Sequence, residues 1–269
     1  MRYVVTILIA VAVVLAVYLL CENCILLTVR HVKLGKRLRI AHISDVHRKR
    51  YQGDNMLIAA RVGQEKPDLI FITGDLVSRK EADFSVTEKL LRELRKIAPV
   101  YMIYGNHEQS LITRERARDF EAMLARTDVV LLRNSSESVE VGGSIFNICG
   151  IEPPYTTYKK GHGYFNIDRL TVDDIRGLVG YPIGETLLLA HNPIFGSEYA
   201  EWGADYTFSG HVHGGAVRLF GIGLLSPERK FFPKYTKGVY DIGGKKLCVS
   251  AGIGKLRAFN PPEIVVYDI

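Results

Sequence analysis

Gly210-His211-Val212-His213-Gly214-Gly215 follows a short apolar run, residues 206–208, whose composition is that of a buried strand. Four earlier apolar runs, at residues 38–43, 69–72, 100–103 and 187–190, also end in side chains that can bind a metal ion. Those endings are Asp45-Val46-His47, Gly74-Asp75, Gly105-Asn106-His107-Glu108 and His191-Asn192-Pro193. Because α/β proteins assemble sites from the ends of neighbouring strands, we expect the five clusters to form one site.

The residue types indicate the chemistry of this site. Asp, His and Asn supply oxygen and nitrogen ligands, and no cysteine lies in any cluster. This set favours two divalent ions, with Mn expected and Fe or Zn as alternatives. Two ions about 3.5–4 Å apart need a bridging group, for which the Asp75 carboxylate is suited, and together they would activate a water against a phosphoryl group. His107 is then placed to protonate the leaving group or to contact a phosphoryl oxygen.

Each motif has an ordinary structural explanation when it is taken alone. An Asp-x-His sequence is common, a Gly-Asp pair after a strand more often forms a turn, and a single His191 would more often be a buried core histidine. Five of the eight histidines nevertheless lie in the clusters. Their joint occurrence after successive strands favours the metal site.

The five clusters, in this order from Asp45 to His213, resemble those of the calcineurin-like metallophosphoesterases. The resemblance covers nearly the whole chain beyond its apolar N-terminus. It is greatest to the membrane-associated bacterial branch that includes phosphodiesterases of unknown substrate and UDP-2,3-diacylglucosamine hydrolases. A four-layer α/β-β/α sandwich is the fold that the resemblance implies.

The resemblance also implies a role for each ligand. Asp75 would bridge two ions, and His107 would be the catalytic histidine. The first ion would be held by Asp45, His47 and His213, and the second by Asn106, His191 and His211. No ligand of the family pattern is missing, which speaks against a non-catalytic metal-binding scaffold.

Two departures from the family pattern concern substrate contacts. Ala216 stands where relatives often carry Gln, and Arg48-Lys49-Arg50 stands where many carry Leu-Gly. We therefore take Arg48, Arg50 and Arg218 as candidate substrate-binding residues.

The N-terminus has the length and composition of a membrane anchor. Residues 3–21 carry no charge and approach the roughly 20 residues that span a bilayer. A signal peptide has a shorter apolar core, of about 7–15 residues, and no Ala-x-Ala cleavage site follows here. Only Arg2 precedes the apolar run, whereas five basic residues follow it between Arg30 and Arg39, which favours a catalytic domain on the cytoplasmic face of the cell membrane. The same basic stretch could instead contact anionic headgroups.

Length and charge fit one catalytic domain. We expect an anchor over residues 1–24, a basic linker over 25–37 and a metallophosphoesterase domain over 38–269. The net charge of +6 suits a phosphate-bearing substrate and does not by itself imply nucleic acid. Cys149 and Cys248 lie in apolar runs and are expected to be buried free thiols.

The apolar periodicity predicts an α/β fold, with two mixed sheets packed face to face and helices outside. Strands and helices alternate up to His107, which implies right-handed crossovers and parallel pairing. Thr113 and Thr171 are expected N-caps, and Ser85 with Glu88 an expected capping box. Helices are predicted at 54–65, 85–97, 113–125 and 171–179, and further strands at 144–150, 216–220, 238–242, 246–250 and 264–268.

Two loops, residues 153–165 and 219–235, interleave aromatic and apolar with basic side chains. Such loops beside a phosphoesterase site suit a lipid phosphate or a membrane surface. Ordinary packing on the sheet explains them equally well, and aromatic residues between lysines can also stack on bases. The expected function is hydrolysis of a phosphoester or pyrophosphate in a lipid-linked or envelope substrate. A nucleotide phosphodiesterase or nuclease is the alternative, although the anchor makes a nucleic-acid substrate the weaker candidate.

Overall fold

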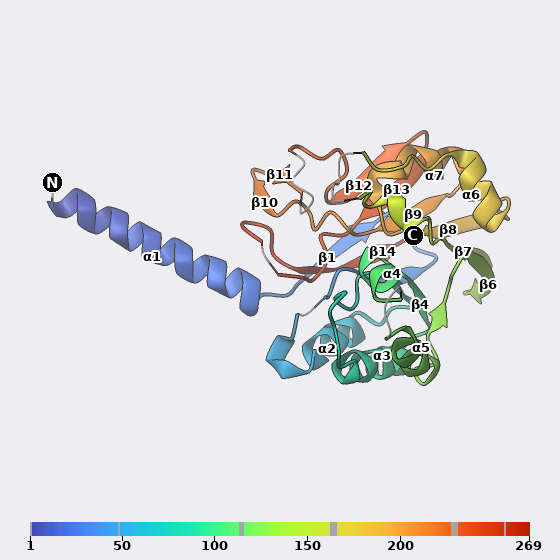
Figure 1. Ribbon diagram of the computed structural model, residues 1–269, viewed down its shortest axis with the longest axis horizontal. Helices are drawn as coiled ribbons and strands as arrows, with labels where there is room; N and C mark the ends of the chain where they lie inside the picture. The colour runs from blue at the N-terminus through green and yellow to red at the C-terminus, as the bar shows by residue number, and fades with distance from the viewer. Residues whose placement is uncertain (1, 48, 113–115, 162–165, 227–230, 256) are drawn as a thin grey trace.

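The computed structural model describes residues 2–47, 49–112, 116–161, 166–226, 231–255 and 257–269 (Figure 1). Arg48, the expected N-cap Thr113 and parts of both expected substrate loops lie outside these residues. Two six-stranded sheets form the centre of the described structure, and a two-stranded hairpin accompanies them.

The first sheet has the strand order β1-β14-β2-β3-β4-β5. Strands β2, β3 and β4 pair in parallel, as the alternation of strands and helices before His107 predicts. The unpredicted β5 pairs in parallel with β4, and β14 runs antiparallel to β2. The strands are β1 Thr28–Lys33, β14 Glu263–Asp268, β2 Arg39–Ile43, β3 Leu69–Thr73, β4 Val100–Ile103 and β5 Val130–Leu131.

The second sheet has the order β12-β13-β9-β8-β7-β6, in which the four central strands are parallel and the two outer strands antiparallel. Its strands are β12 Gly238–Ile242, β13 Lys245–Val249, β9 Tyr206–Ser209, β8 Glu185–Leu189, β7 Ser144–Gly150 and β6 Ser135–Val141. The separate hairpin consists of β10 Val217–Leu219 and β11 Ile222–Leu225.

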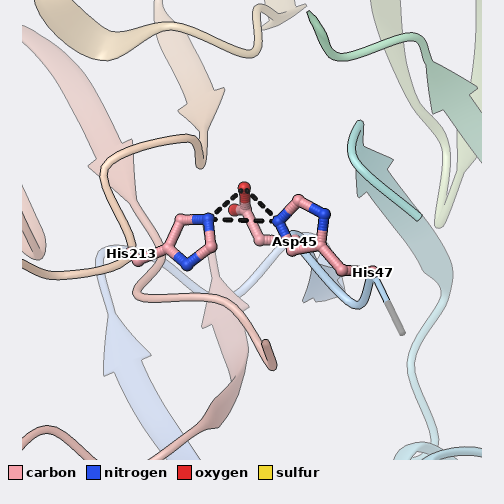
Figure 2. A group of neighbouring side chains, drawn as sticks. All are labelled: Asp45, His47 and His213. Atoms are coloured by element: carbon pink, nitrogen blue, oxygen red, sulfur yellow. Dashed lines mark hydrogen bonds and ion pairs between the residues drawn. The ribbon is translucent and has the colours of Figure 1, made fainter. Parts of the chain in front are cut away.

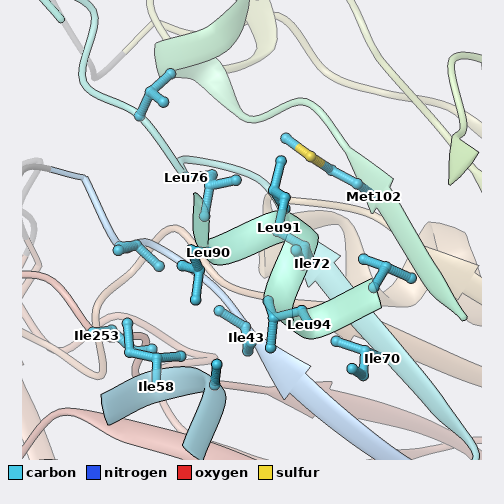
Figure 3. Packing of buried hydrophobic residues seen from close by; sticks show 14 of the residues in the cluster. Ile43, Ile58, Ile70, Ile72, Leu76, Leu90, Leu91, Leu94, Met102 and Ile253 are labelled. Carbon is cyan, nitrogen blue, oxygen red and sulfur yellow. The ribbon is translucent and has the colours of Figure 1, made fainter. Parts of the chain in front are cut away.

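Alternating side chains of the strands build the layers. In β3, Ile70 and Ile72 face α2 Met56–Glu65, α3 Ser85–Ile97 and α5 Ala117–Ala125 (Figure 3), whereas Leu69 and Phe71 face the second sheet. Helices α6 Val172–Val179 and α7 Gly196–Trp202 cover the far side of the second sheet, α6 through Ile175 and α7 through Tyr199. The predicted four-layer sandwich is therefore confirmed.

The two expected helix caps have different outcomes. Thr171 caps α6 and forms a reciprocal capping box with Asp174. The Ser85/Glu88 capping box is wrong: α3 begins at Ser85 itself, and Phe84 precedes it with no side-chain cap. Glu88 instead binds Arg92 and Arg126, because two charge-assisted contacts stabilise its carboxylate more than one backbone amide does.

Residues 28–33 of the expected linker over 25–37 form strand β1. β1 pairs in parallel with β14 along the edge of the first sheet. Arg30 binds Glu263, and two further arginines, Arg37 and Arg39, bind Glu185 and Asp268. Three of the five basic residues after the apolar run are therefore paired within the domain, which reduces the charge available to lipid headgroups.

Helix α1, Arg2–Cys24, projects from the body of the molecule (Figure 1). Its most apolar window has a mean hydropathy of 3.1, and none of that window is buried. The helix is long and apolar enough to cross a membrane, a property that an anchor and a signal sequence share.

The C-terminal end of α1 is joined to the catalytic body by a buried polar cluster. Glu22 is 0% exposed, and its carboxylate accepts hydrogen bonds from the backbone N–H groups of Phe259 and Asn260. Asn23 next to it exchanges two hydrogen bonds with the backbone of Arg257, at 2.8 and 3.0 Å. The end of α1 thus forms part of the folded domain.

We predict that Glu22→Ala destabilises the full chain by about 1–3 kcal/mol, because it leaves the buried N–H group of Asn260 without an acceptor. Chemical unfolding of the detergent-solubilised protein measures this loss. Glu140→Ala, on the exposed face of β6, is the matched control and should change stability little. Equal stability of the two variants would contradict a structural role for Glu22.

Candidate metal centre

The strand ends place the predicted ligands in one cluster through an unusual backbone. Asp45, His47, Asp75, His211 and His213 all have positive φ, between 51° and 69°. This left-handed conformation is uncommon for residues other than glycine and concentrates at functional sites. Here it turns each side chain back toward the cluster instead of continuing the strand.

Asp45, His47 and His213 form the first group (Figure 2). The Asp45 Oδ1 atom lies 3.4 Å from His213 Nε2 and 3.9 Å from His47 Nε2, and the two Nε2 atoms are 3.1 Å apart. Asp45 is fully buried, and its carboxylate accepts the backbone N–H of His211 and the hydroxyl of Ser44. Three ligand atoms from two sheets therefore converge on one point.

Asp75, His191 and His211 form the second group. His191 Nε2 lies 3.4 Å from Asp75 Oδ2 and 3.2 Å from His211 Nδ1. The same Asp75 oxygen lies 3.7 Å from Nε2 of His47, which belongs to the first group. Asp75 consequently stands between the groups, where the predicted bridging ligand is required.

Protonation and hydrogen bonding fit these residues to a cation. His191 Nδ1 lies 2.6 Å from the Thr73 carbonyl oxygen, so it donates its proton there and leaves Nε2 for a metal. Asn106 is buried, and its Oδ1 atom has no hydrogen-bond partner among the described residues. An orphaned amide oxygen beside two histidine–carboxylate groups is the environment expected of a metal ligand.

The charges of the cluster depend on one another. Burial lowers the pKa of His47 to about 3, which keeps its imidazole neutral and able to bind a metal. Burial also disfavours the charged form of His191, but the Asp75 carboxylate outweighs it and raises the pKa of His191 to about 9. Burial by itself would raise the pKa of Asp75, yet His191 and His107 hold it well below its usual range. A metal ion at Asp75 would displace the proton of His191.

His107 is held between the two groups by its backbone and its ring. Its backbone N–H donates to Asp75 Oδ1 at 2.7 Å, and its Nδ1 atom accepts the backbone N–H of Arg79 at 3.4 Å. Since Nδ1 is an acceptor, the neutral ring carries its proton on Nε2, which lies 4.0 Å from Asp75 Oδ2. Burial lowers the pKa of His107, so this neutral form is favoured.

Glu108 supports the site in a way that the sequence reasoning missed. Its carboxylate is fully buried and accepts the backbone N–H groups of Asp75, Val77 and Gly105 at 2.8–3.0 Å. It therefore ties the loop after β3 to the loop after β4. Burial raises the pKa of Glu108 to about 7, and the nearby Asp75 contributes. The sequence feature that could have indicated this role is the position of Glu108 directly after Asn106 and His107 in the motif over residues 105–108.

Tyr158 was also missed. Its ring packs on those of His191 and His211, with centroids 5.8 and 5.2 Å apart, and its hydroxyl is buried with no partner among the described residues. The residue lies in the 153–165 loop, which the sequence links to substrate choice but not to the histidines.

The candidate substrate arginines have other contacts. Arg50 lies 3.5 Å from Glu81, and Arg218 donates to the carbonyl of Gly214 and to the Thr236 hydroxyl. Arg48 lies outside the described residues. A substrate role for the three arginines stays a prediction.

The loops of the two sheets gather buried carboxylates, histidines and an amide oxygen that has no partner in the described part of the chain, an arrangement that fits a metal-dependent hydrolase. The chain belongs to the calcineurin-like phosphoesterases, whose family model matches residues 38–215. It is 28% identical to an uncharacterized metallophosphoesterase of Aquifex aeolicus, over 87% of this chain and 86% of that protein. It is 24% identical to the phosphodiesterase YaeI of Escherichia coli, over 86% of this chain and 82% of that protein. The crystal structure of TT1561 of Thermus thermophilus superposes with a TM-score of 0.46 and 9% identity, over 82% of this chain and 91% of that one.

We predict that Glu108→Gln lowers stability by about 1–3 kcal/mol, because an amide offers one acceptor oxygen to three backbone N–H groups. Thermal unfolding of the metal-stripped protein measures the loss without a contribution from bound ions. The exposed Glu201→Gln is the control. Unchanged unfolding of Glu108→Gln would show that the loops are held together by other contacts.

Proposed function

We propose that this chain is a membrane-anchored, two-metal phosphoesterase that hydrolyses a phosphoester or pyrophosphate bond in a lipid-linked substrate. Family membership and the histidine–carboxylate groups support a hydrolase with divalent metals. We propose that the metals are two Mn ions. Asp45, His47 and His213 would hold one ion, Asn106, His191 and His211 would hold the other, and Asp75 would contribute to both. Bound at these ligands, the ions would supply Lewis acidity toward the phosphoryl group and lower the pKa of an attacking water.

The observation that carries the lipid-linked substrate is an apolar pocket beside the candidate ligands. The pocket has a volume of about 200 Å³ and shares Asn192 and Val212 with the loops that contain His191, His211 and His213. Its other walls are mainly apolar: Pro193, Ile194, Ser226, Phe231, Pro233, Lys234 and Tyr235. Such a pocket binds an acyl or prenyl chain better than it binds a sugar or a base, because burial of methylene groups contributes about 0.8 kcal/mol each.

Different residues would bind the lipid, the phosphate and the leaving group. The apolar pocket would hold the lipid part, and Lys234, whose ammonium lies 4.7 Å from the Tyr235 ring centre, would face phosphate charge at the pocket mouth. In its protonated form, His107 would transfer the Nε2 proton to the leaving-group oxygen and return to a neutral ring. We propose that α1 is retained as the anchor and that the domain faces the cytoplasm, in line with the excess of basic residues after the helix.

A nucleotide phosphodiesterase is the second candidate, since the same ligands would serve a nucleotide. The apolar walls of the pocket favour the lipid, and the aromatic residues of the 153–165 loop favour the nucleotide.

The pocket proposal predicts different effects on two kinds of substrate. Ile194→Ser, in the pocket wall, should raise KM several-fold for an acylated phosphodiester in mixed micelles and leave a water-soluble nitrophenyl phosphodiester unaffected. Ile194 is 44% exposed, so the substitution should not unfold the protein. Ile183→Ser, which is exposed and outside the pocket, is the control. Equal losses on both substrates, or efficient hydrolysis of nucleotides alone, would refute the lipid-linked substrate.

The role of His107 predicts a dependence on the leaving group. His107→Ala should lower turnover of an alkyl ester about 10²–10⁴-fold, because the positioned proton donor is lost. The loss should be much smaller for a nitrophenyl ester, whose leaving group needs no protonation. Metal content, measured by mass spectrometry, should stay near that of the unaltered protein and of the exposed control His31→Ala. Equal losses of turnover for both esters would indicate that His107 contacts a phosphoryl oxygen and does not protonate the leaving group.

A further inference from the structure

Exposed phenylalanines lie in the turn of the β10–β11 hairpin, in the loop that follows it and in the loop that contacts α1. We call this group the phenyl collar: Phe220, Ile222, Phe231, Phe232 and Phe259. Phe220 is 100% exposed, and Phe231 and Phe232 are 76% and 68% exposed. In Figure 1 the β10–β11 hairpin lies on the side of the body from which α1 emerges. Large apolar side chains that gather at one surface mark a contact with another phase or molecule.

The backbone of the collar is strained. Phe220, Phe232 and Phe259 have φ of 48°, 49° and 56°, in the left-handed region that bulky residues avoid. Among the described residues, the other non-glycine positions with positive φ are candidate metal ligands or carry Asn, Asp or Lys: Asp45, His47, Asn55, Lys66, Asp75, Asp128, Asn134, His211 and His213. Strain of this kind concentrates at functional positions.

The collar is continuous with the apolar surface of α1. Phe259 stacks on Tyr18, with ring centroids 5.7 Å apart and planes 20° apart, and with α1 it lines an apolar groove along Ala10, Val11, Val14 and Leu15. Tyr18 lies one helical turn before Glu22, which is about 6 Å along the helix axis. Because the Glu22 carboxylate binds the backbone N–H of Phe259, the level of Phe259 relative to α1 is set by the fold.

We infer that the phenyl collar docks the catalytic domain on the surface of the lipid bilayer that surrounds α1. Aromatic side chains at the level of the last turn of a spanning helix lie in the interfacial layer, where their rings are stable. Phe231 belongs both to the collar and to the apolar pocket, so the pocket mouth opens at that layer. The inference requires α1 to be an anchor but does not require a lipid-linked substrate, and its test measures no hydrolysis.

The test uses the full chain in nanodiscs of phosphatidylethanolamine and phosphatidylglycerol whose acyl chains carry bromine, a quencher of tryptophan fluorescence. Phe220→Trp reports on the collar, and Tyr181→Trp, at a 73% exposed site between α6 and β8, is the matched control. The natural Trp202 is buried and gives a constant background that the unaltered chain measures. We expect quenching of the new tryptophan at 220 to be several-fold greater than at 181. Equal quenching at both positions would overturn the docking.

A second comparison separates docking from packing. Glycine adopts positive φ without strain, so Phe220→Gly should leave the unfolding midpoint unchanged or raise it. Combined with Phe232→Trp, the same change should reduce quenching at 232 by brominated lipid. If Phe220→Gly lowers the unfolding midpoint and leaves quenching at position 232 unchanged, the collar is a packing element. If the tryptophan emission in detergent depends on protein concentration, the collar is a contact between copies of the chain. Either result would refute the membrane surface as its partner.

Discussion

The structure of the site depends on the burial of two ionised carboxylates close together. Asp45 and Asp75 are 0% and 2% exposed, a position in which an uncompensated negative charge is unstable. His191, whose pKa the Asp75 carboxylate raises, lies 3.4 Å from that carboxylate. His213 lies 3.4 Å from Asp45, and the neutral His47 lies 3.7 Å from Asp75. Divalent cations at the same atoms would complete the neutralisation, which is why the ligand geometry and the charge balance lead to the same conclusion.

The surrounding backbone is shaped by this requirement. A side chain at Gly210 would meet the Ser44 hydroxyl and the Asp45 carboxylate, and a Cβ at Gly105 would lie 2.4 Å from Asp75 Oδ1, so both positions need glycine. The left-handed conformations of the ligands and the bonds from Glu108 to two loops serve the same end. The free energy that these features cost is offset by the packed sheets on which the loops stand.

Helix α1 and the candidate metal centre are physically connected. Asn260 donates to the carbonyl oxygens of His213 and Gly215, and its own backbone N–H is bound by Glu22. The backbone N–H of Arg257 donates to the Asn23 side chain, and its guanidinium donates to the carbonyl oxygens of Ala251 and Gly254. The loop behind His213 thus takes part of its support from the last residues of α1.

The sequence by itself determined the features that rest on local periodicity and on parallel-sheet geometry. The apolar runs that end in Asp45, Asp75 and Asn106 meet at one edge of the first sheet, and those that end in His191 and His211 meet at one edge of the second, because parallel strands present their carboxyl ends at a common edge. The order of strands and helices indicated two sheets with helices outside, and the family resemblance implied the four layers. The uncharged N-terminal run was enough for α1. Only the tertiary structure decided which polar groups lose water and must find partners. Glu108, Tyr158 and Glu22 acquired their positions in this way, as did β1, whose basic residues pair with carboxylates far away in the chain. Such pairings have no local signature, since they depend on which distant groups are buried together.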